Sequence, residues 1–305
     1  MGYLDKVTRL INTKSLLLEI DRKLSALVFA SPIGVSERLA GYINRFFYSL
    51  LSKVPKNIID NGRTLREDGF EYLGAIAEPR DIEDIRKYAE ESMRQERQCY
   101  STIIKSGSVI QEIVELDDSK IMATIKRVVE PKVLNAFRSM SKSNIQILYF
   151  LFMRNHPVKD LQGESYSDFW HVDGCRTDLM KCFILLSDVG ENSGATRILT
   201  RQKTREVLRS NHRIRQTQVQ GSSIEVLDKM HRENQVLGKS GHGYIWDPTT
   251  CLHCAGITEE NENPRDILMI TAVPSTDNNL DPIGIAKANT TSMFSMKKLI
   301  LKEST

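Results

Sequence analysis

The feature that most constrains the fold is a series of short apolar runs in the second half of the chain. Runs rich in β-branched, aliphatic and aromatic residues recur between turns, at 145–153, 181–186, 195–199, 243–246 and 267–273. No long helical pattern alternates with them, which argues against a parallel doubly wound sheet. Short strands separated by turns are typical of a β-sandwich or β-barrel.

Helical patterns precede these runs and interrupt them once. The spacing predicts a short strand at 71–73, a helix from Pro79 to about 98, and more helix from about 119 that is interrupted near Pro131. One further helix, with a capping box, begins at Ser222. The whole pattern predicts an α+β chain with a mainly β core.

Composition narrows the class of protein. The 305 residues suit one large domain with an appendage. Their 42 basic and 39 acidic residues give a formal net charge of +3, which is too balanced to favour a nucleic-acid partner. No apolar run reaches the roughly 20 residues of a membrane-spanning helix. Five cysteines without an export signal favour a reduced, cytoplasmic compartment.

The N-terminal segment differs from the rest of the chain. Its first 57 residues hold nine basic and four acidic residues, a net charge of +5. Two amphipathic helical patterns lie at 16–28 and 39–54. Helices of this kind pack on the following domain or on each other, form a dimer contact, or bind an anionic membrane surface through residues 15–54. We expect a helical extension at 1–60, a main domain at 61–280 and a tail at 281–305.

Three separated residues form a candidate metal site. His171 and Asp173 are two apart on an expected strand, so both side chains point to the same side. His253 follows 82 residues later, just after another run. Two imidazoles and one carboxylate form the facial triad of non-heme Fe(II) oxygenases, whose open positions accept a 2-oxo acid and O2.

Arg265 supports the same interpretation through charge. Fe(II), Asp173 and a doubly charged 2-oxoglutarate together leave one negative charge, which one guanidinium neutralises. The planar fork of arginine also binds a carboxylate bidentately. Burying an uncompensated charge costs several kcal/mol. We therefore expect Arg265 to bind the distal carboxylate of 2-oxoglutarate.

These residues and their flanks resemble the phytanoyl-CoA dioxygenase-like family of Fe(II)/2-oxoglutarate-dependent oxygenases. The resemblance covers roughly 62 to 275. It is carried by the segments LREDGFEYL (65–73), FWHVDG (169–174), KCFILLSDV (181–189), NSGATR (192–197), LHCAG (252–256) and PR (264–265). It implies a double-stranded β-helix, a jelly-roll or cupin-like barrel, with flanking helices and an N-terminal helical extension.

The resemblance also implies an activity. The enzyme would hydroxylate an unactivated C–H bond of a small-molecule, lipid or sugar substrate, with release of succinate and CO2. Relatives that halogenate lack the carboxylate ligand, so Asp173 favours hydroxylation or a related oxidation. The basic N-terminal helices and the basic stretch 197–215 mildly favour an anionic or membrane-associated substrate, although a solvated face is the default interpretation of that stretch.

The sequence departs from the family pattern in two places. The expected Pro-Gly-Ser-His segment is replaced by TRQK at 200–203, and Ala255 occupies a position that often carries a hydroxyl. Another group must therefore complete the 2-oxoglutarate pocket. The candidates are Thr196, Lys181 and Tyr149.

Other functions stay open at this point. Structural zinc on Cys251, His253 and Cys254 has poor ligand spacing. A non-catalytic barrel that binds a metal or ligand, and an interaction module that docks on membranes, are the rivals from other classes. His242, between two glycines, is expected in a turn. The sequence leaves the oligomeric state open.

Overall fold

The computed structural model describes residues 48–50, 54, 58, 63–97, 99–103, 109–158, 170–173, 179–209, 213–215, 218–220, 234–275 and 283. The helix predicted at Ser222 and nearly all of the N-terminal patterns and C-terminal tail lie outside these residues. Residues 48–50, in the second N-terminal pattern, are helical. Within the described residues, no helix is both long and apolar enough to cross a membrane.

The described chain begins with mixed elements and continues mainly with strands. In order they are α4 (Arg63–Asp68), β1 (Phe70–Ala75), α5 (Pro79–Arg94), β2 (Cys99–Ile103), β3 (Val109–Glu115), α6 (Ser119–Val129), α7 (Lys132–Ser141), β4 (Asn144–Asn155), β5 (Met180–Leu185), β6 (Arg197–Ile198), α8 (Arg201–Arg209), β7 (Arg213–Arg215), β8 (Gln218–Gln220), β9 (His242–Trp246), β10 (His253–Cys254) and β11 (Arg265–Ser275).

One large sheet forms the frame of the molecule. Its seven strands follow the order β1-β9-β5-β11-β4-β3-β2, and every neighbouring pair is antiparallel. β11 is central and pairs with β4 over its whole length. Its burial is nearly continuous, from Arg265 to Pro274, because both faces of the sheet are covered.

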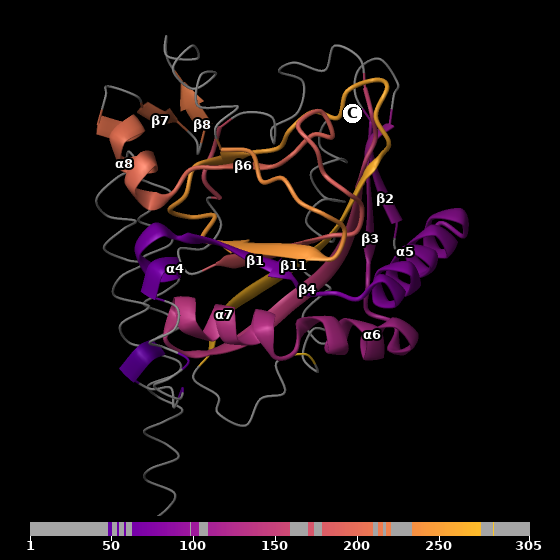
Figure 1. The fold of residues 1–305 in the computed structure, drawn as a ribbon, viewed down its shortest axis with the longest axis horizontal. Coiled ribbons are helices and arrows are strands. Elements are labelled where there is room, and N and C mark those ends of the chain that lie inside the picture. The colour runs from indigo at the N-terminus through magenta and orange to yellow at the C-terminus, as the bar shows by residue number, and fades with distance from the viewer. Residues whose placement is uncertain are drawn as a thin grey trace, which may run out of the picture.

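Alternate residues of this sheet contribute to two apolar cores. Leu268 and Ile270 of β11 face the helices and pack with buried side chains of α5, α6 and α7. Ile267 and Met269 face the other way, toward Phe183, Tyr244 and Trp246. We call this second side the inward face. Figure 1 shows α5, α6 and α7 on the opposite side of the sheet from β6 and α8.

A smaller set of strands lies across the inward face. β10 pairs with β6, and isolated bridges join His171 to His253 and Ser193 to Thr258. Gly194 has a φ of +71°, and a Cβ there would meet the Thr258 nitrogen at 2.8 Å. Glycine is therefore required for these two segments to approach so closely.

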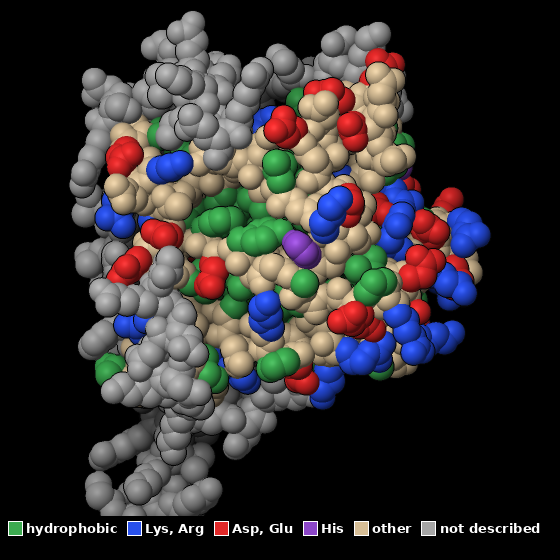
Figure 2. All heavy atoms as spheres, viewed as in Figure 1, with side chains coloured by type: hydrophobic (Ala, Val, Ile, Leu, Met, Phe, Trp, Pro, Cys, Tyr) green, Lys and Arg blue, Asp and Glu red, His purple; other side chains and the backbone are tan. Residues whose placement is uncertain are grey.

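The helices form where their apolar spacing predicts. Pro79 opens α5, which buries Ile82, Ile85 and Ala89 but ends four residues before the expected position at 98. Asp118 caps α6 by accepting from the backbone N–H of Lys120 at 2.9 Å. The outward face of α5 carries charged side chains of both signs, visible at the right of Figure 2. Figure 2 also shows apolar side chains in a hollow near the centre of this view.

The predicted strands are confirmed, with some corrections. The five apolar runs correspond to β4, β5, β6, β9 and β11, although β6 is only two residues long. The helices α4 and α8 and the strands β2, β3, β7, β8 and β10 are additional to the prediction. The turn expected at His242 is wrong: this residue begins β9, where its Nδ1 lies 2.6 Å from the hydroxyl oxygen of Tyr72.

Candidate metal centre

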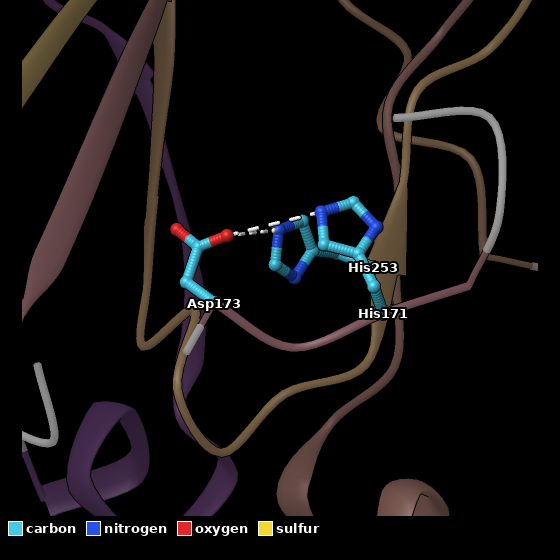
Figure 3. Close-up of side chains that lie close together, drawn as sticks. All are labelled: His171, Asp173 and His253. Atoms are coloured by element: carbon cyan, nitrogen blue, oxygen red, sulfur yellow. Dashed lines mark ion pairs between the residues drawn. The ribbon is translucent and has the colours of Figure 1, made fainter. Parts of the chain in front are cut away.

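Three side chains from two distant segments of the chain lie close together beside the inward face. His171 and His253 exchange both backbone hydrogen bonds, each at 3.0 Å, so their imidazoles project side by side. The strand expected across His171 and Asp173 is wrong: His171 forms only an isolated bridge, and the segment then leaves the ladder. There the Asp173 N–H donates to the Pro248 carbonyl at 2.8 Å. Figure 3 shows the carboxylate facing the two imidazoles across a short gap.

The distances within this group are short. One oxygen of Asp173, Oδ1, lies 3.8 Å from Nε2 of His171 and 3.5 Å from Nε2 of His253. The potential ligand atoms all lie within 4.8 Å of one another. Because a metal ion bonds nitrogen and oxygen ligands at about 2.1 Å, separations of this size are compatible with one shared ion.

The surroundings orient both kinds of ligand. Nδ1 of His253 lies 3.0 Å from the Cys251 carbonyl, which can only accept, so Nδ1 carries a proton and Nε2 is the ring nitrogen that faces Asp173. A backbone carbonyl of this kind commonly fixes the tautomer of a metal-ligating histidine. This contact could not be predicted from the sequence, because it depends on how the chain turns at Cys251.

Lys181 contacts the other oxygen of the same carboxylate. Its Nζ lies 2.5 Å from Oδ2 of Asp173, which leaves Oδ1 to the two imidazoles. Burial opposes ionisation of Asp173, but the Lys181 ammonium and the contact with His253 outweigh it and hold the pKa of Asp173 well below its usual value. Lys181, expected near the 2-oxoglutarate pocket, therefore lies against a proposed metal ligand.

Arg265 is a buried cation on the same inward face, only 3% exposed. It donates to the Gly194 carbonyl and, at 3.4 Å, to the hydroxyl of Thr196. With its amide oxygen turned toward the guanidinium, Asn155 accepts from Nε at 3.2 Å. Among the described residues, no carboxylate oxygen lies within 4 Å of this guanidinium. Burial lowers the pKa of Arg265, and the nearby Tyr244 opposes that change.

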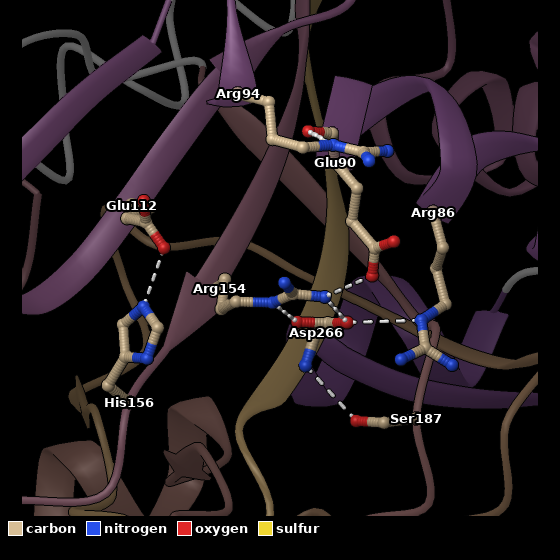
Figure 4. Close-up of polar contacts among 8 residues, drawn as sticks. All are labelled: Arg86, Glu90, Arg94, Glu112, Arg154, His156, Ser187 and Asp266. Atoms are coloured by element: carbon tan, nitrogen blue, oxygen red, sulfur yellow. Dashed lines mark hydrogen bonds and ion pairs between the residues drawn. The ribbon is translucent and has the colours of Figure 1, made fainter. Parts of the chain in front are cut away.

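A second charge cluster fixes the residue after Arg265 on the side of the sheet that the helices cover. There Asp266 pairs with Arg154 at 2.7 Å and with Arg86 at 3.1 Å (Figure 4). Its backbone N–H donates to the Ser187 hydroxyl at 3.1 Å. Because neighbouring residues of a strand point to opposite faces, this clamp directs Arg265 inward.

The strand register links Arg265 and the triad. Thr196, which contacts Arg265, is two residues from Ile198, and Ile198 pairs with His253. Two residues of strand span roughly 7 Å. A short dicarboxylate therefore has the right scale to connect the two groups.

The third pocket candidate, Tyr149, belongs to a row of residues across the large sheet. Trp246 pairs with Lys181, Lys181 with Thr271, and Thr271 with Tyr149. The whole row lies on the inward face at the level of Asp173. The structure thus brings Lys181 to the triad and Thr196 to Arg265, while Tyr149 lies two strands from Lys181.

Comparisons with known proteins identify the fold. No family model matches the chain, and no curated protein matches it by sequence. Solved structures do match it. EctD from S. alaskensis, in its apo form, superposes with a TM-score of 0.52 at 12% identity, over 76% of this chain and 83% of that one. The chain is a double-stranded β-helix.

Other solved structures are similar over comparable lengths. The epimerase SnoN, in complex with Fe3+, alpha ketoglutarate and nogalamycin RO, has a TM-score of 0.49 and 11% identity, over 72% of this chain and 85% of that one. HygX from Streptomyces hygroscopicus, with nickel and 2-oxoglutarate bound, has a TM-score of 0.42 and 13% identity, over 73% and 88%. The narrower resemblance to the phytanoyl-CoA dioxygenase-like family stays a prediction.

One arginine of the basic stretch 197–215 is structural rather than solvated. Arg201, at the start of α8, lies 2.5 Å from the fully buried carboxylate of Asp247 and donates to the Thr250 hydroxyl at 2.8 Å. It also donates to the Arg66 carbonyl. Arg201 thereby links α8 to α4 and to the segment that follows β9, and these contacts occupy its guanidinium.

Replacing this arginine tests that role. We expect Arg201→Met to lower the free energy of unfolding by about 2 kcal/mol, because a buried carboxylate loses a charged hydrogen-bond donor. Arg205→Met, an exposed position of the same helix, is the matched control and changes stability little. Urea unfolding measures both. Equal stability of the two variants would show that Arg201 contributes nothing specific.

The sequence also gave no indication of a buried acid on the inward face. Glu115, at the end of β3, is 6% exposed, and its Oε1 has no hydrogen-bond partner. Burial, with a smaller contribution from Asp117, raises the pKa of Glu115 from 4.5 to about 7. β3 (VIQEIVE) mixes acidic and aliphatic residues, so its sequence does not show which side chains are buried.

This pKa gives a prediction for Glu115→Gln. The folded state holds the proton more tightly than the unfolded state, so the wild type loses stability as the pH rises from about 4.5 to about 7. The variant avoids that loss. We expect its advantage in free energy of unfolding to grow across this window to about 1 to 3 kcal/mol and then to level off. Denaturant unfolding at pH 5 and pH 8 measures it, with Glu91→Gln on α5 as the exposed control.

Proposed function

We propose that the chain is an Fe(II)- and 2-oxoglutarate-dependent oxygenase, with His171, Asp173 and His253 as the metal ligands. The observation that carries the proposal is the convergence of these three side chains inside a double-stranded β-helix. Two imidazoles and one carboxylate suit Fe(II) and leave positions for a co-substrate and O2.

The local contacts support iron rather than a closed structural metal site. Among the described residues, the group has two nitrogen ligands and one oxygen ligand. Structural zinc sites usually have four protein ligands, often cysteine. Cys254, next to His253, belongs instead to a small apolar cluster with Trp170 and Leu252.

The co-substrate assignment depends on Arg265. A buried guanidinium without a described carboxylate partner has an unmet need for an anion. In our proposal it binds the distal carboxylate of 2-oxoglutarate, with the Thr196 hydroxyl beside it. This carboxylate would take over donors that now bind neutral acceptors, including the Gly194 carbonyl.

The residues of the chain then have separate tasks. Bound Fe(II), 2-oxoglutarate and O2 supply the oxidising power, with succinate and CO2 as products. Lys181 holds Asp173 so that one oxygen faces the metal position, and the Cys251 carbonyl holds His253. Phe183 and Trp246 line the inward face with apolar surface that excludes water.

We further propose that the reaction is hydroxylation of an unactivated C–H bond in a small molecule. The resemblance to the phytanoyl-CoA dioxygenase-like family supports this, and Asp173 occupies the position that halogenating relatives leave without a carboxylate. The cytoplasmic location stays a prediction. So does membrane contact through residues 15–54, most of which lie outside the described residues.

Turnover without a primary substrate tests the proposed function. Anaerobic Fe(II) and 2-oxoglutarate should produce a weak visible charge-transfer band, and admission of O2 should then release succinate. If the wild type shows neither signal, the proposal is wrong. Binding of anionic lipid vesicles through the N-terminal segment in that case would favour the interaction-module alternative.

A further inference from the structure

The inward face carries polar atoms that the protein itself does not satisfy. In the described part of the chain, five buried side-chain atoms have no hydrogen-bond partner. Three of the five, Glu115 Oε1, Trp246 Nε1 and Thr271 Oγ1, belong to residues of this one face. Because buried polar atoms in native proteins nearly always have partners, such a concentration points to a ligand.

Glu115 reaches this face through the alternation of β3. Ile113, two residues earlier, belongs to the inward apolar cluster, whereas Val114 belongs to the core under the helices. Glu115 therefore shares the side of Ile113, and it pairs with Leu151, another inward residue. Glutamate is rarely buried unless it is paired, so this placement needs an explanation.

The neighbours of Glu115 are typical of a site for a cation. Tyr100 pairs with Ile113 on the adjacent strand. Burial raises the pKa of the Tyr100 hydroxyl, and the negative charge of Glu115 raises it further. Tyr149 lies two residues before Leu151 on the other flank. Of the described Lys and Arg side chains, none lies within 4 Å of the Glu115 carboxylate. A carboxylate with aromatic neighbours attracts an ammonium group through charge and ring quadrupole.

The co-substrate cannot supply this partner. 2-Oxoglutarate offers only acceptor oxygens and two negative charges, so Glu115 repels it. Of the two organic molecules in the proposed reaction, only the primary substrate can therefore supply a donor to Glu115. From two strand spacings and two residues of rise, the backbones of Glu115 and Thr271 are roughly 12 Å apart.

We propose that Glu115, flanked by Tyr100 and Tyr149, binds a cationic amino group of the primary substrate. This inference rests on the proposed function and names the substrate class. The substrate is a small molecule with an amine at one end, long enough to extend roughly 10 Å from Glu115 toward the triad. It replaces the expectation of an anionic substrate group, which came from surface charge alone.

Binding of simple amines tests the proposal before the natural substrate is known. The full-length chain, loaded anaerobically with Fe(II) and 2-oxoglutarate at pH 8, is titrated calorimetrically with n-butylamine, putrescine and spermidine, and with n-butanol as the uncharged probe. We expect the amines to bind more tightly than the alcohol. Glu115→Gln should weaken amine binding roughly ten- to a hundredfold, the loss of one charged contact.

The control and the contrary outcomes keep the inference separate from the proposed function. Glu112→Gln removes an acid from the same strand. The Glu112 carboxylate is on the side of the sheet opposite the inward face and pairs with His156, so amine binding should not change. Amines that bind no better than butanol, or equally well to Glu115→Gln, would overturn the role of Glu115. Succinate release after O2 is admitted to the same preparations reports the proposed function. Succinate release without amine selectivity rejects only this inference, and amine selectivity without succinate release rejects only the oxygenase assignment.

Discussion

Asp173→Ala should abolish both the charge-transfer band and succinate release. Loss of a supporting contact around a metal ligand typically costs 10- to 100-fold in affinity or activity, so loss of the carboxylate ligand itself should cost roughly 1,000-fold or more. Asp173 is also the only one of the three proposed ligands that carries a negative charge to offset the charge of Fe(II). Metal binding by equilibrium dialysis and succinate by chromatography measure the two effects separately.

The matched control is Asp188→Ala. Asp188 is an exposed acid whose carboxylate contacts Lys239 at 2.8 Å and the Ser240 N–H, rather than the triad. This variant should retain full metal binding and turnover. If Asp173→Ala binds Fe(II) as tightly as the wild type does, Asp173 is not a ligand and the facial triad is wrong.

Arg265→Lys should raise the Michaelis constant for 2-oxoglutarate by roughly 100-fold while leaving metal binding in place. Lysine keeps the charge, but it loses the planar fork that can contact a carboxylate and the Thr196 hydroxyl together. Removing part of a buried charge pair typically costs 2 kcal/mol or more, which corresponds to roughly 30-fold or greater. Uncoupled succinate release at varied 2-oxoglutarate measures the change.

Arg127→Lys is the control for this substitution. Arg127 pairs with Asp81 at 2.7 Å on the exposed side of the helices, so its replacement should leave the constant unchanged. An unchanged constant in Arg265→Lys itself would mean that another cation binds the distal carboxylate. Lys181 would then be the next candidate to examine.

The convergence of His171, Asp173 and His253 could be predicted from short motifs, whereas their role as ligands and the role of Arg265 stay proposals. His171 and Asp173 are two residues apart, and Arg265 opens an apolar strand twelve residues after His253. The contact between His171 and His253 is long-range, but antiparallel pairing of short strands explains it. Local spacing therefore carried most of the information about the site.

The parts that the sequence did not reveal depend on long-range contacts. Arg201 looks like any surface arginine until the fold brings it to Asp247, 46 residues away. Lys181 points to the inward face by alternation, but alternation within one strand does not predict its tertiary contact with Asp173. β3 was missed because its acids, including Glu115, obscure the alternation of its apolar residues.

The most direct test of the account is an anaerobic crystal structure with Fe(II) and 2-oxoglutarate. We predict one metal ion per chain, bonded to Nε2 of His171, Nε2 of His253 and one oxygen of Asp173, with the distal carboxylate of 2-oxoglutarate on Arg265. Fe(II) bound elsewhere, or a guanidinium of Arg265 that still contacts only protein acceptors while 2-oxoglutarate is bound, would contradict the account.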